Sequence, residues 1–321
     1  MKKITKIILC LVLCFVLLPS SVFATKLLVP VGQLIGLELG DNRVVVAAFD
    51  KTLGKTTEAA GLKVGDQITQ IDGKSITRTQ DVSAALHTSD GQVQVSVLRN
   101  GKLYQIKVKP VITADGPKLG VYLKQGITGV GTVTWYDPDT GAFGALGHGV
   151  NTPQGELLRL RSGKAYRAAV ASVVKGKVGT PGQLLGSLKN PEPLGEIYKN
   201  TPQGIFGKTN VGWTGEPLPV GESKDIHTGK ATIRSNVSDQ DVQEYSVEIL
   251  KIYSGAKNER NMLLKITDPE LLAATGGIIQ GMSGSPIIQD GKLIGAVTHV
   301  LVNDPTTGYG IFIENMLDAA A

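Results

Sequence analysis

The sequence GMSGSP at residues 281–286 sets Ser283 between two glycines. A serine hydroxyl is a poor nucleophile without an adjacent base, and the oxyanion formed by its attack needs preorganised hydrogen-bond donors. Glycines beside the serine allow a tight turn that aims successive backbone N–H groups at one point. Ser283 is therefore the candidate nucleophile, and the N–H groups of Gly281 and Ser283 form a candidate oxyanion hole. Ser285 is the weaker candidate, because it precedes Pro286 and lacks a following glycine.

The sequence on both sides of this turn predicts β structure. Residues 287–289 and 293–300 are apolar runs separated by Asp290-Gly291, which predicts a hairpin directly after the serine. A strand pair after a G-x-S-G turn is typical of chymotrypsin-like proteases. The chain from Gly120 onward is punctuated by glycine and shows no alternation of strands and helices, which argues against a doubly wound α/β fold.

The base that activates a serine is usually a histidine. His148 lies in GALGHG at residues 144–149, an apolar and glycine-rich setting that is unusual for a plain turn. His299 lies on the strand expected after the nucleophile, so it remains an alternative base, with a pocket-lining or structural role preferred. His227 lies in a polar loop and is expected to be solvated.

Composition limits the fold and the partners. A length of 321 residues suffices for about two domains, and 40 glycines with 5% aromatic residues indicate many tight turns rather than a helical bundle. The net charge is +5, but Lys2, Lys3 and Lys6 lie in an N-terminal segment without acidic residues. The rest of the chain is nearly neutral, so we expect no nucleic-acid partner.

Residues 1–24 have the three zones of a secretory signal: a basic start, an apolar run over residues 7–18, and the small-x-small sequence VFA at 22–24. Cleavage after Ala24 and retention as a membrane anchor both remain open, and both place the body of the protein outside the cytoplasm. Cys10 and Cys14 lie in this segment, so the mature chain has no disulfide, thiol nucleophile or cysteine-bound metal. The chain lacks H-E-x-x-H and its four histidines are scattered, so we expect no metal and no cofactor.

Residues 34–110 alternate short β-like runs with turn signals around a helix-like pattern at 79–87. The sequence EAAGLKVGDQITQIDGKSI at 58–76 resembles the centre of a PDZ domain. The matching carboxylate-binding loop and first strand are assigned to Ile35, Gly36, Leu37, Glu38 and Leu39. The resemblance implies that this loop holds the carboxylate of a peptide ligand, which adds a strand to the sheet edge. A β domain that serves only as a spacer is the alternative.

The whole set of features resembles the stage IV sporulation protein B peptidases of endospore-forming bacteria. Besides the signal and the PDZ sequence, the resemblance rests on LGHG at 146–149, on residues 278–286 and on THVLVNDPTTGYGIFI at 298–313. It implies a mainly β protein in which the PDZ domain, a linker at 111–119 and a chymotrypsin-like double β-barrel serine peptidase at 120–321 follow one another.

The same resemblance implies a function. Such an enzyme is secreted from the forespore into the space between the membranes, and there it cleaves a regulator that restrains an intramembrane protease. Family members also process their own N-terminal region. A catalytically inactive PDZ scaffold and a general quality-control protease of the cell envelope are the alternatives.

Within this resemblance Ser283 corresponds to the nucleophile, His148 to the base and Asp268 to the acid. The local sequence offers a competing role for Asp268, because Asp-Pro-Glu at 268–270 is a strong helix N-cap pattern. Asp225 is the rival acid, since it lies farther ahead of the serine, as the acid of chymotrypsin-like enzymes does. The sequence leaves the choice between Asp268 and Asp225 open.

Overall fold

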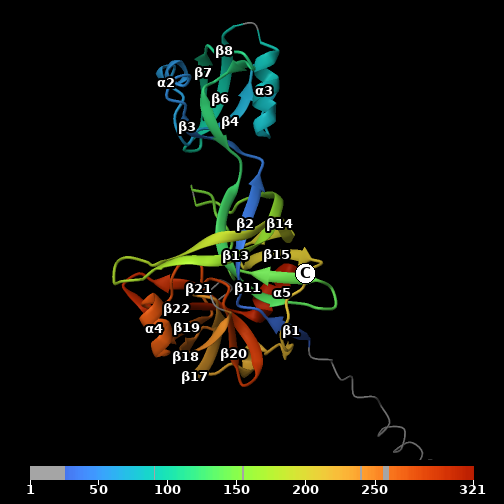
Figure 1. The fold of residues 1–321 in the computed structure, drawn as a ribbon, viewed down its shortest axis with the longest axis vertical. Coiled ribbons are helices and arrows are strands. Elements are labelled where there is room, and N and C mark those ends of the chain that lie inside the picture. The colour runs from blue at the N-terminus through green and yellow to red at the C-terminus, as the bar shows by residue number, and fades with distance from the viewer. Residues whose placement is uncertain (1–25, 90, 154, 239–240, 256–259) are drawn as a thin grey trace, which may run out of the picture.

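The computed structural model describes residues 26–89, 91–153, 155–238, 241–255 and 260–321. The predicted signal segment, with both cysteines, lies outside the described residues. Within the described part of the chain no helix combines the length and apolar character needed to cross a bilayer. The described residues form a double β-barrel and a smaller body that stands above it in Figure 1.

The first barrel closes through six strands, in which the ring runs β11-β12-β15-β14-β13-β2 and returns to β11. Two short strands, β1 (Leu27–Pro30) and β16 (Leu218–Pro219), extend it beyond β11. The ring consists of β2 (Leu34–Asp41), β11 (Ile127–Tyr136), β12 (Ala142–Ala145), β13 (Leu160–Val174), β14 (Gln183–Thr201) and β15 (Gly204–Thr209).

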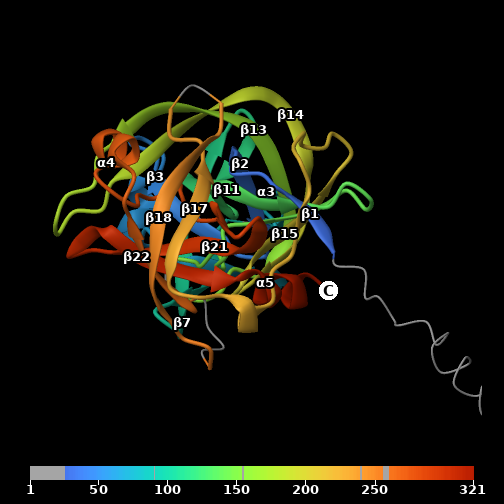
Figure 2. The same ribbon diagram turned by 90° about the horizontal axis from the view of Figure 1, so that it is seen from below.

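The second barrel also closes through six strands, in the order β17-β18-β19-β22-β21-β20. Figure 2 shows β17, β18, β21 and β22 from below, with the C-terminal helix α5 beside them. The strands are β17 (Gly229–Ser235), β18 (Gln243–Ile252), β19 (Met262–Ile266), β20 (Pro286–Gln289), β21 (Lys292–Leu301) and β22 (Asp304–Phe312). The helices are η1 (Ser223–Asp225), α4 (Pro269–Thr275) and α5 (Ile313–Ala320).

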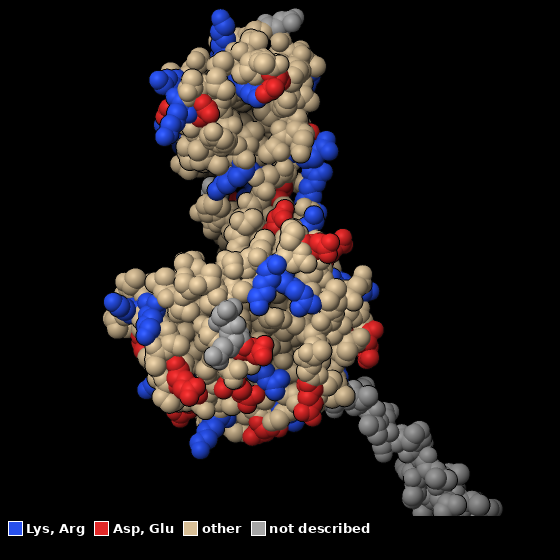
Figure 3. All heavy atoms as spheres, in the orientation of Figure 1, with Lys and Arg blue, Asp and Glu red and all other residues tan. Residues whose placement is uncertain are grey.

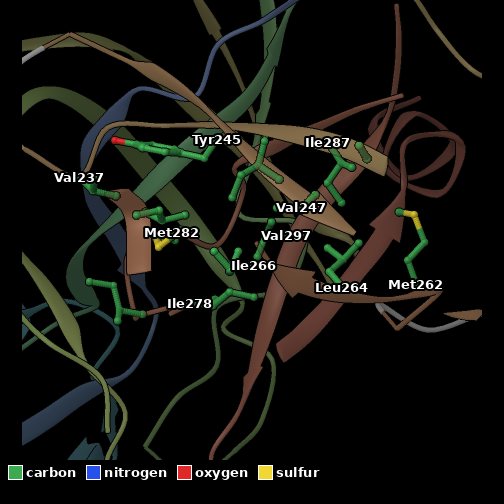
Figure 4. Packing of buried hydrophobic residues seen from close by; sticks show 14 of the residues in the cluster. Val237, Tyr245, Val247, Met262, Leu264, Ile266, Ile278, Met282, Ile287 and Val297 are labelled. Carbon is green, nitrogen blue, oxygen red and sulfur yellow. The ribbon is translucent and has the colours of Figure 1, made fainter. Parts of the chain in front are cut away.

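The core of the second barrel reaches the turn that carries Ser283. Met282 is fully buried and belongs to the same apolar cluster as Ile278, Val297 and Leu264 (Figure 4). Burial of a side chain of this size stabilises the fold by about 1.5–3 kcal/mol. The residue before the candidate nucleophile is therefore fixed by the barrel core, and Ser283 starts from a rigid position.

The smaller body has its own apolar core and a five-strand path ordered β10-β3-β4-β6-β7, with β5 paired to β4. It contains two helices, α2 (Lys55–Ala59) and α3 (Thr79–His87). Its strands are β3 (Val44–Phe49), β4 (Gln67–Ile71), β5 (Lys74–Ser75), β6 (Val93–Arg99), β7 (Lys102–Val108) and β10 (Val121–Lys124); a separate hairpin pairs β8 (Val111–Thr113) with β9 (Gly116–Lys118).

The assignment of Ile35, Gly36, Leu37, Glu38 and Leu39 to the PDZ peptide-binding edge is wrong. These residues lie in β2, and β2 is hydrogen-bonded along both edges, to β11 on one side and to β13 on the other. A strand with two occupied edges cannot accept a peptide as a further strand. In the smaller body it is β10, not β2, that pairs with β3.

The domain boundaries differ accordingly from the sequence prediction. The smaller body runs from β3 to β10 and is inserted between β2 and β11, two neighbouring strands of the first barrel. The predicted linker at 111–119 contains the β8–β9 hairpin. The first residues of the predicted peptidase segment, including Val121–Lys124, belong to the PDZ-like sheet.

A two-stranded ribbon joins the two bodies. β2 continues into β3 and β10 continues into β11, and the pairs β3–β10 and β2–β11 are both antiparallel (Figure 1). At the break between them the Gln125 side chain donates 2.6 Å to the Asp41 carbonyl. Arg43 forms ion pairs with Asp41 and with Glu156, which belongs to the first barrel's loop after His148. The ribbon therefore connects the PDZ-like body directly to strands and loops around the site described next.

Candidate active site

A cavity of about 500 Å³ is lined by residues from both barrels and contains both His148 and Ser283. The first barrel supplies apolar side chains of β2 and β11, and the second supplies residues around Ile278–Ser283 and Thr298–Val302. Among the described residues that line it, none is Asp, Glu, Lys or Arg, and the titratable groups are His148 and His299. The cavity thus combines many apolar side chains with one serine and two imidazoles.

Ser283 lies in a turn whose shape depends on the flanking glycines. Gly281 and Gly284 have φ of 102° and 98°, in the region that favours glycine. A Cβ on Gly284 would lie 2.0 Å from the Thr132 carbonyl oxygen, so no other residue fits without rearrangement. The Ser283 Oγ donates a 2.7 Å hydrogen bond to the Thr298 carbonyl.

The N–H groups of Gly281 and Ser283 have no hydrogen-bond acceptor within the described chain. Thr132 of β11, which is buried, holds the same turn from the other barrel: its Oγ1 donates 2.7 Å to the Gly281 carbonyl and its N–H donates 3.1 Å to the Ser283 carbonyl. The turn therefore presents two unused N–H groups while its carbonyls are occupied, as an oxyanion hole requires.

His148 follows β12 after two residues with positive φ, Leu146 at 70° and Gly147 at 69°. Its Nδ1 lies 2.9 Å from the Gly149 carbonyl oxygen. Because a carbonyl only accepts, Nδ1 carries the proton in the neutral ring and Nε2 is the ring's acceptor. This is the tautomer that a general base acting on a serine hydroxyl needs.

His299 lies in the same cavity, with its ring centroid 5.1 Å from that of His148. The structure thus brings both candidate bases to Ser283's cavity. Ser285 is different, because it is fully buried and its Oγ donates 3.1 Å to the Ser235 hydroxyl.

Asp268 lies outside this cavity, at the N-cap of α4. One carboxylate oxygen accepts 3.0 Å hydrogen bonds from the N–H groups of Glu270 and Leu271, and the other accepts from Ser246 N–H at 3.3 Å. The structure therefore shows the capping role that the local sequence predicts and does not bring Asp268 to His148.

Asp225 and His227 are also away from the cavity. Asp225 is exposed, and its carboxylate lies 3.5 Å from the Lys292 ammonium. His227 is exposed, as expected, with Nε2 2.9 Å from an Asp290 carboxylate oxygen. The Thr228 carbonyl and the Asp290 carboxylate raise the pKa of His227. No group of three or more side chains that could hold a metal ion occurs in the part of the chain that the structure describes.

Sequence reasoning missed two residues around the site. Thr132 links the nucleophile turn to the segment before His148, because its carbonyl also accepts from Leu146 N–H at 3.2 Å. Asn200, at the end of β14, accepts from the N–H of Val150 and donates to its carbonyl, two residues after His148. Neither residue stands out in its local sequence. Thr132 lies in an ordinary β-like run, and Asn200 belongs to a polar segment typical of a turn.

Two family models match this chain. The model described as SpoIVB peptidase S55 matches residues 115–317, and the PDZ domain model matches residues 34–109. The chain belongs to the SpoIVB peptidase S55 family. This S55 peptidase is a serine peptidase hydrolase with a PDZ domain in its N-terminal half and the two closed barrels of a chymotrypsin-like protease, as the sequence predicts. The PDZ match includes β2, although the S55 chain uses that strand in its first barrel.

The solved structures similar to parts of this S55 peptidase include a PDZ domain and a protease. The PDZ domain of an SdrC-like protein from Listeria monocytogenes is 26% identical, with 26% of this chain and 87% of that chain covered and a TM-score of 0.22. The Rv3671c protease from M. tuberculosis in its active form is 14% identical, with 62% and 75% covered and a TM-score of 0.37. Its inactive form is also 14% identical, with 60% and 82% covered and a TM-score of 0.34.

Proposed function

We propose that this S55 peptidase is a secreted serine endopeptidase that acts in signalling between the two cells of a sporangium. Its substrates are a membrane-associated regulator of an intramembrane protease and its own N-terminal region, and it works in the space between forespore and mother cell. The observation that carries the catalytic part is that His148 and Ser283, from different barrels, line one apolar cavity. The signalling role rests on family membership and on the signal-like sequence at 1–24.

In the proposed reaction His148 Nε2 takes the proton of Ser283 Oγ while Oγ attacks the scissile carbonyl carbon. The N–H groups of Gly281 and Ser283 stabilise the oxyanion. The imidazolium then protonates the leaving amine, and a water molecule, activated by the same imidazole, hydrolyses the acyl-enzyme. Before attack the Ser283 hydroxyl turns away from the Thr298 carbonyl, to which it donates in this structure.

The cavity lining supports a substrate class. Half of its lining residues are Leu, Ile or Val, the polar ones include Asn151, Gln280 and Thr298, and the lining described above has no carboxylate or ammonium that would pair with a charged substrate residue. Burying apolar substrate side chains there is favourable by about 25 cal/mol per Å², whereas an unpaired charge would be penalised. We infer that the residues flanking the scissile bond are apolar.

The PDZ-like body supports a separate peptide ligand. β10 and β7 stand at the two ends of its sheet path, where each is paired along one edge, to β3 and to β6 respectively, and the other edge of each is one that a peptide strand can extend. The peptide ligand of this body is therefore assigned to an end of this sheet, at β10 or at β7.

The experiment that tests the catalytic proposal compares Ser283→Ala with the matched control Ser172→Ala, which removes an exposed hydroxyl on β13. Both variants and the parent chain are incubated with a fluorophosphonate probe and with peptides of apolar sequence, and products are followed by mass spectrometry. Ser283→Ala should lose labelling, peptide cleavage and self-cleavage, since loss of a nucleophile lowers turnover about a millionfold. Ser172→Ala should behave as the parent; self-cleavage by Ser283→Ala would overturn the assignment.

Further variants separate the alternatives. Activity in His299→Ala and none in His148→Ala identifies His148 as the base, and the reverse identifies His299. A parent chain that never labels is a catalytically inactive scaffold, and one that readily degrades unfolded casein is a quality-control protease. Chromosomal Ser283→Ala should block spore formation in the source bacterium while leaving vegetative growth intact.

A further inference from the structure

We propose that Asn200 is a positioning residue for the His148 imidazole and acts through the peptide unit between Gly149 and Val150. The proposal rests on the proposed function, because it gives His148 the role of base. It supplies the orienting group that neither Asp268 nor Asp225 supplies in this structure.

Asn200 stands at the end of β14, half-buried beside the segment that follows His148. Its Oδ1 accepts a 2.9 Å hydrogen bond from Val150 N–H. Its Nδ2 donates 2.9 Å hydrogen bonds to the carbonyls of Val150 and Leu158. One donor and two acceptors surround the amide, so its orientation is fixed by its partners.

The neighbouring backbone holds the same segment. Gly149 N–H donates 3.2 Å to the Pro202 carbonyl, and a Cβ on Gly149 would lie 2.7 Å from the Thr201 carbonyl oxygen. Residues 149 and 150 thus pack closely against the turn that starts at Asn200. The segment has little freedom to shift while these contacts persist.

The consequence for the imidazole follows from the planarity of the peptide bond. The Gly149 carbonyl and the Val150 N–H belong to one planar unit and point in opposite directions. Asn200 Oδ1 binds the N–H end at 2.9 Å, and His148 Nδ1 binds the carbonyl end at 2.9 Å. Asn200 therefore fixes the plane of the group that orients the ring.

The two hydrogen bonds also form a chain, from the His148 Nδ1–H through the peptide unit to Asn200 Oδ1. Hydrogen bonds in such a chain polarise one another, so the Gly149 oxygen becomes a stronger acceptor. A stronger acceptor at Nδ1 favours the required tautomer and stabilises the imidazolium that forms when Ser283 loses its proton. These are the two tasks that the acid of a serine triad performs.

The test compares Asn200→Ala, Asn200→Asp and the control Asn190→Ala. Asn190 lies on the same strand, is exposed, and its side chain accepts only a local hydrogen bond from Glu192 N–H. Asn200→Ala removes the acceptor of Val150 N–H, and kcat should fall about a hundredfold with KM nearly unchanged, as for a misplaced catalytic group. Asn190→Ala should match the parent.

Asn200→Asp distinguishes positioning of the His148 imidazole from a purely structural role of the Asn200 side chain. It keeps an acceptor for Val150 N–H and loses both Nδ2 donations, so it disturbs the contacts to the Val150 and Leu158 carbonyls as much as alanine does. Positioning predicts that Asn200→Asp regains most of the lost kcat, at a thermal midpoint no higher than that of Asn200→Ala. Equal kcat losses in both variants, or parent kcat in Asn200→Ala, would overturn the proposal.

A spectroscopic readout keeps this test independent of turnover. In ¹⁵N-histidine spectra, with His148 assigned by comparison with His148→Ala, the parent should show the Nδ1–H tautomer and Asn200→Ala a mixture. A pure Nδ1–H tautomer in Asn200→Ala contradicts the positioning role. If the parent chain lacks turnover, the proposed function fails, and the tautomer comparison still decides the role of Asn200.

Discussion

Leu146 adopts a left-handed conformation, with φ of 70°, two residues before the candidate base. For a residue with a Cβ this conformation costs about 1–3 kcal/mol and persists only where the surroundings enforce it. Here Leu146 is buried against the cavity, and its N–H donates 3.2 Å to the Thr132 carbonyl. Strain at this position is thus held in place by the same strand that holds the nucleophile turn.

Two roles are possible for Asp268, helix N-cap and acid of the catalytic triad, and one pair of variants distinguishes them. As the N-cap seen here, Asp268→Ala should lose about 0.5–2 kcal/mol of unfolding free energy. Asp268→Asn should lose less, because its Oδ1 can still accept from Glu270 and Leu271, although its amide cannot accept from Ser246 N–H. Peptide turnover by the folded protein should match the parent in both variants.

Thermal midpoint and turnover are measured on the same samples. A drop of about ten-thousandfold in turnover by Asp268→Asn, at an unchanged midpoint, is what loss of a triad acid produces. That result would require α4 to move toward His148 in the active enzyme and would make the capped arrangement a resting state.

His227 provides a pH prediction at the surface. The Thr228 carbonyl and the Asp290 carboxylate raise the pKa of His227, so its NMR titration midpoint should exceed the ordinary value of about 6.5. Asp290→Asn should lower that midpoint. Since the folded pKa is the higher one, the pair stabilises the fold below the unfolded pKa and loses this effect as pH rises through the folded pKa. A midpoint unmoved by Asp290→Asn would contradict the pairing.

At the scale of elements, the turns on either side of β20 differ in what surrounds them. Gly284 and Gly291 both have positive φ, 98° and 72°. A Cβ on Gly284 would lie 2.0 Å from the Thr132 carbonyl oxygen, whereas a Cβ on Gly291 meets nothing within 4 Å. Gly291→Ala should therefore lose only about 1 kcal/mol from backbone conformation and keep its activity.

Gly284→Ala should lose activity completely and unfold at a clearly lower temperature, because the nucleophile turn must leave its place. Circular dichroism melts and probe labelling of both variants check the pair. Full labelling of Gly284→Ala would show that the turn tolerates a displacement that this packing excludes.

The sequence was a good guide to elements whose partners are close in the chain. The Ser283 turn and the hairpin after it were predictable, because glycine positions and alternating apolar residues act locally. β2 was assigned to the wrong body, because its sequence suits an edge strand of a PDZ sheet as well as a barrel strand. Its true partners, β11 and β13, are distant in sequence, and local pattern carries no information about such pairing.

The candidate site likewise contains residues that could be predicted from the local sequence and residues that could not. His148 and Ser283 could be found because their chemistry and their glycine-rich surroundings are unusual. The N-cap role of Asp268 could also be predicted from its local sequence. The family resemblance assigned Asp268 to the triad instead, whereas in the structure its carboxylate accepts three hydrogen bonds from backbone N–H groups. The role of Asn200 could not be predicted from the sequence, because an asparagine before a turn is common and only the folded chain shows which backbone groups it binds.

At the scale of the whole molecule, the PDZ-like body is an insertion in the first barrel. Lys, Arg, Asp and Glu are interspersed over both bodies on the face in Figure 3, with no single-sign surface there. Leu39 of β2 and Ile127 of β11 are direct partners, so a short turn between Gly40 and Gly126 would join the two strands as a hairpin.

Replacing residues 41–125 with Asn-Gly should therefore leave a folded double barrel. We expect this shortened chain to cleave short apolar peptides as the parent does, because His148, Ser283 and Asn200 are all retained. Cleavage of a full-length protein substrate should fall if the PDZ-like body recruits it. An unfolded product, judged by circular dichroism, would contradict the independence of the barrels from the insertion.

The ribbon between the bodies also bears on how the chain folds. During synthesis β2 emerges long before β11, and closing so long a segment as a flexible loop carries an entropic cost. Once the PDZ-like body has folded, β3 and β10 lie side by side, and the strands that continue from them, β2 and β11, start as neighbours in the correct register. We therefore expect the inserted body to fold first and to lower the entropic cost of pairing β2 with β11, an effect on folding that is separate from any peptide it binds.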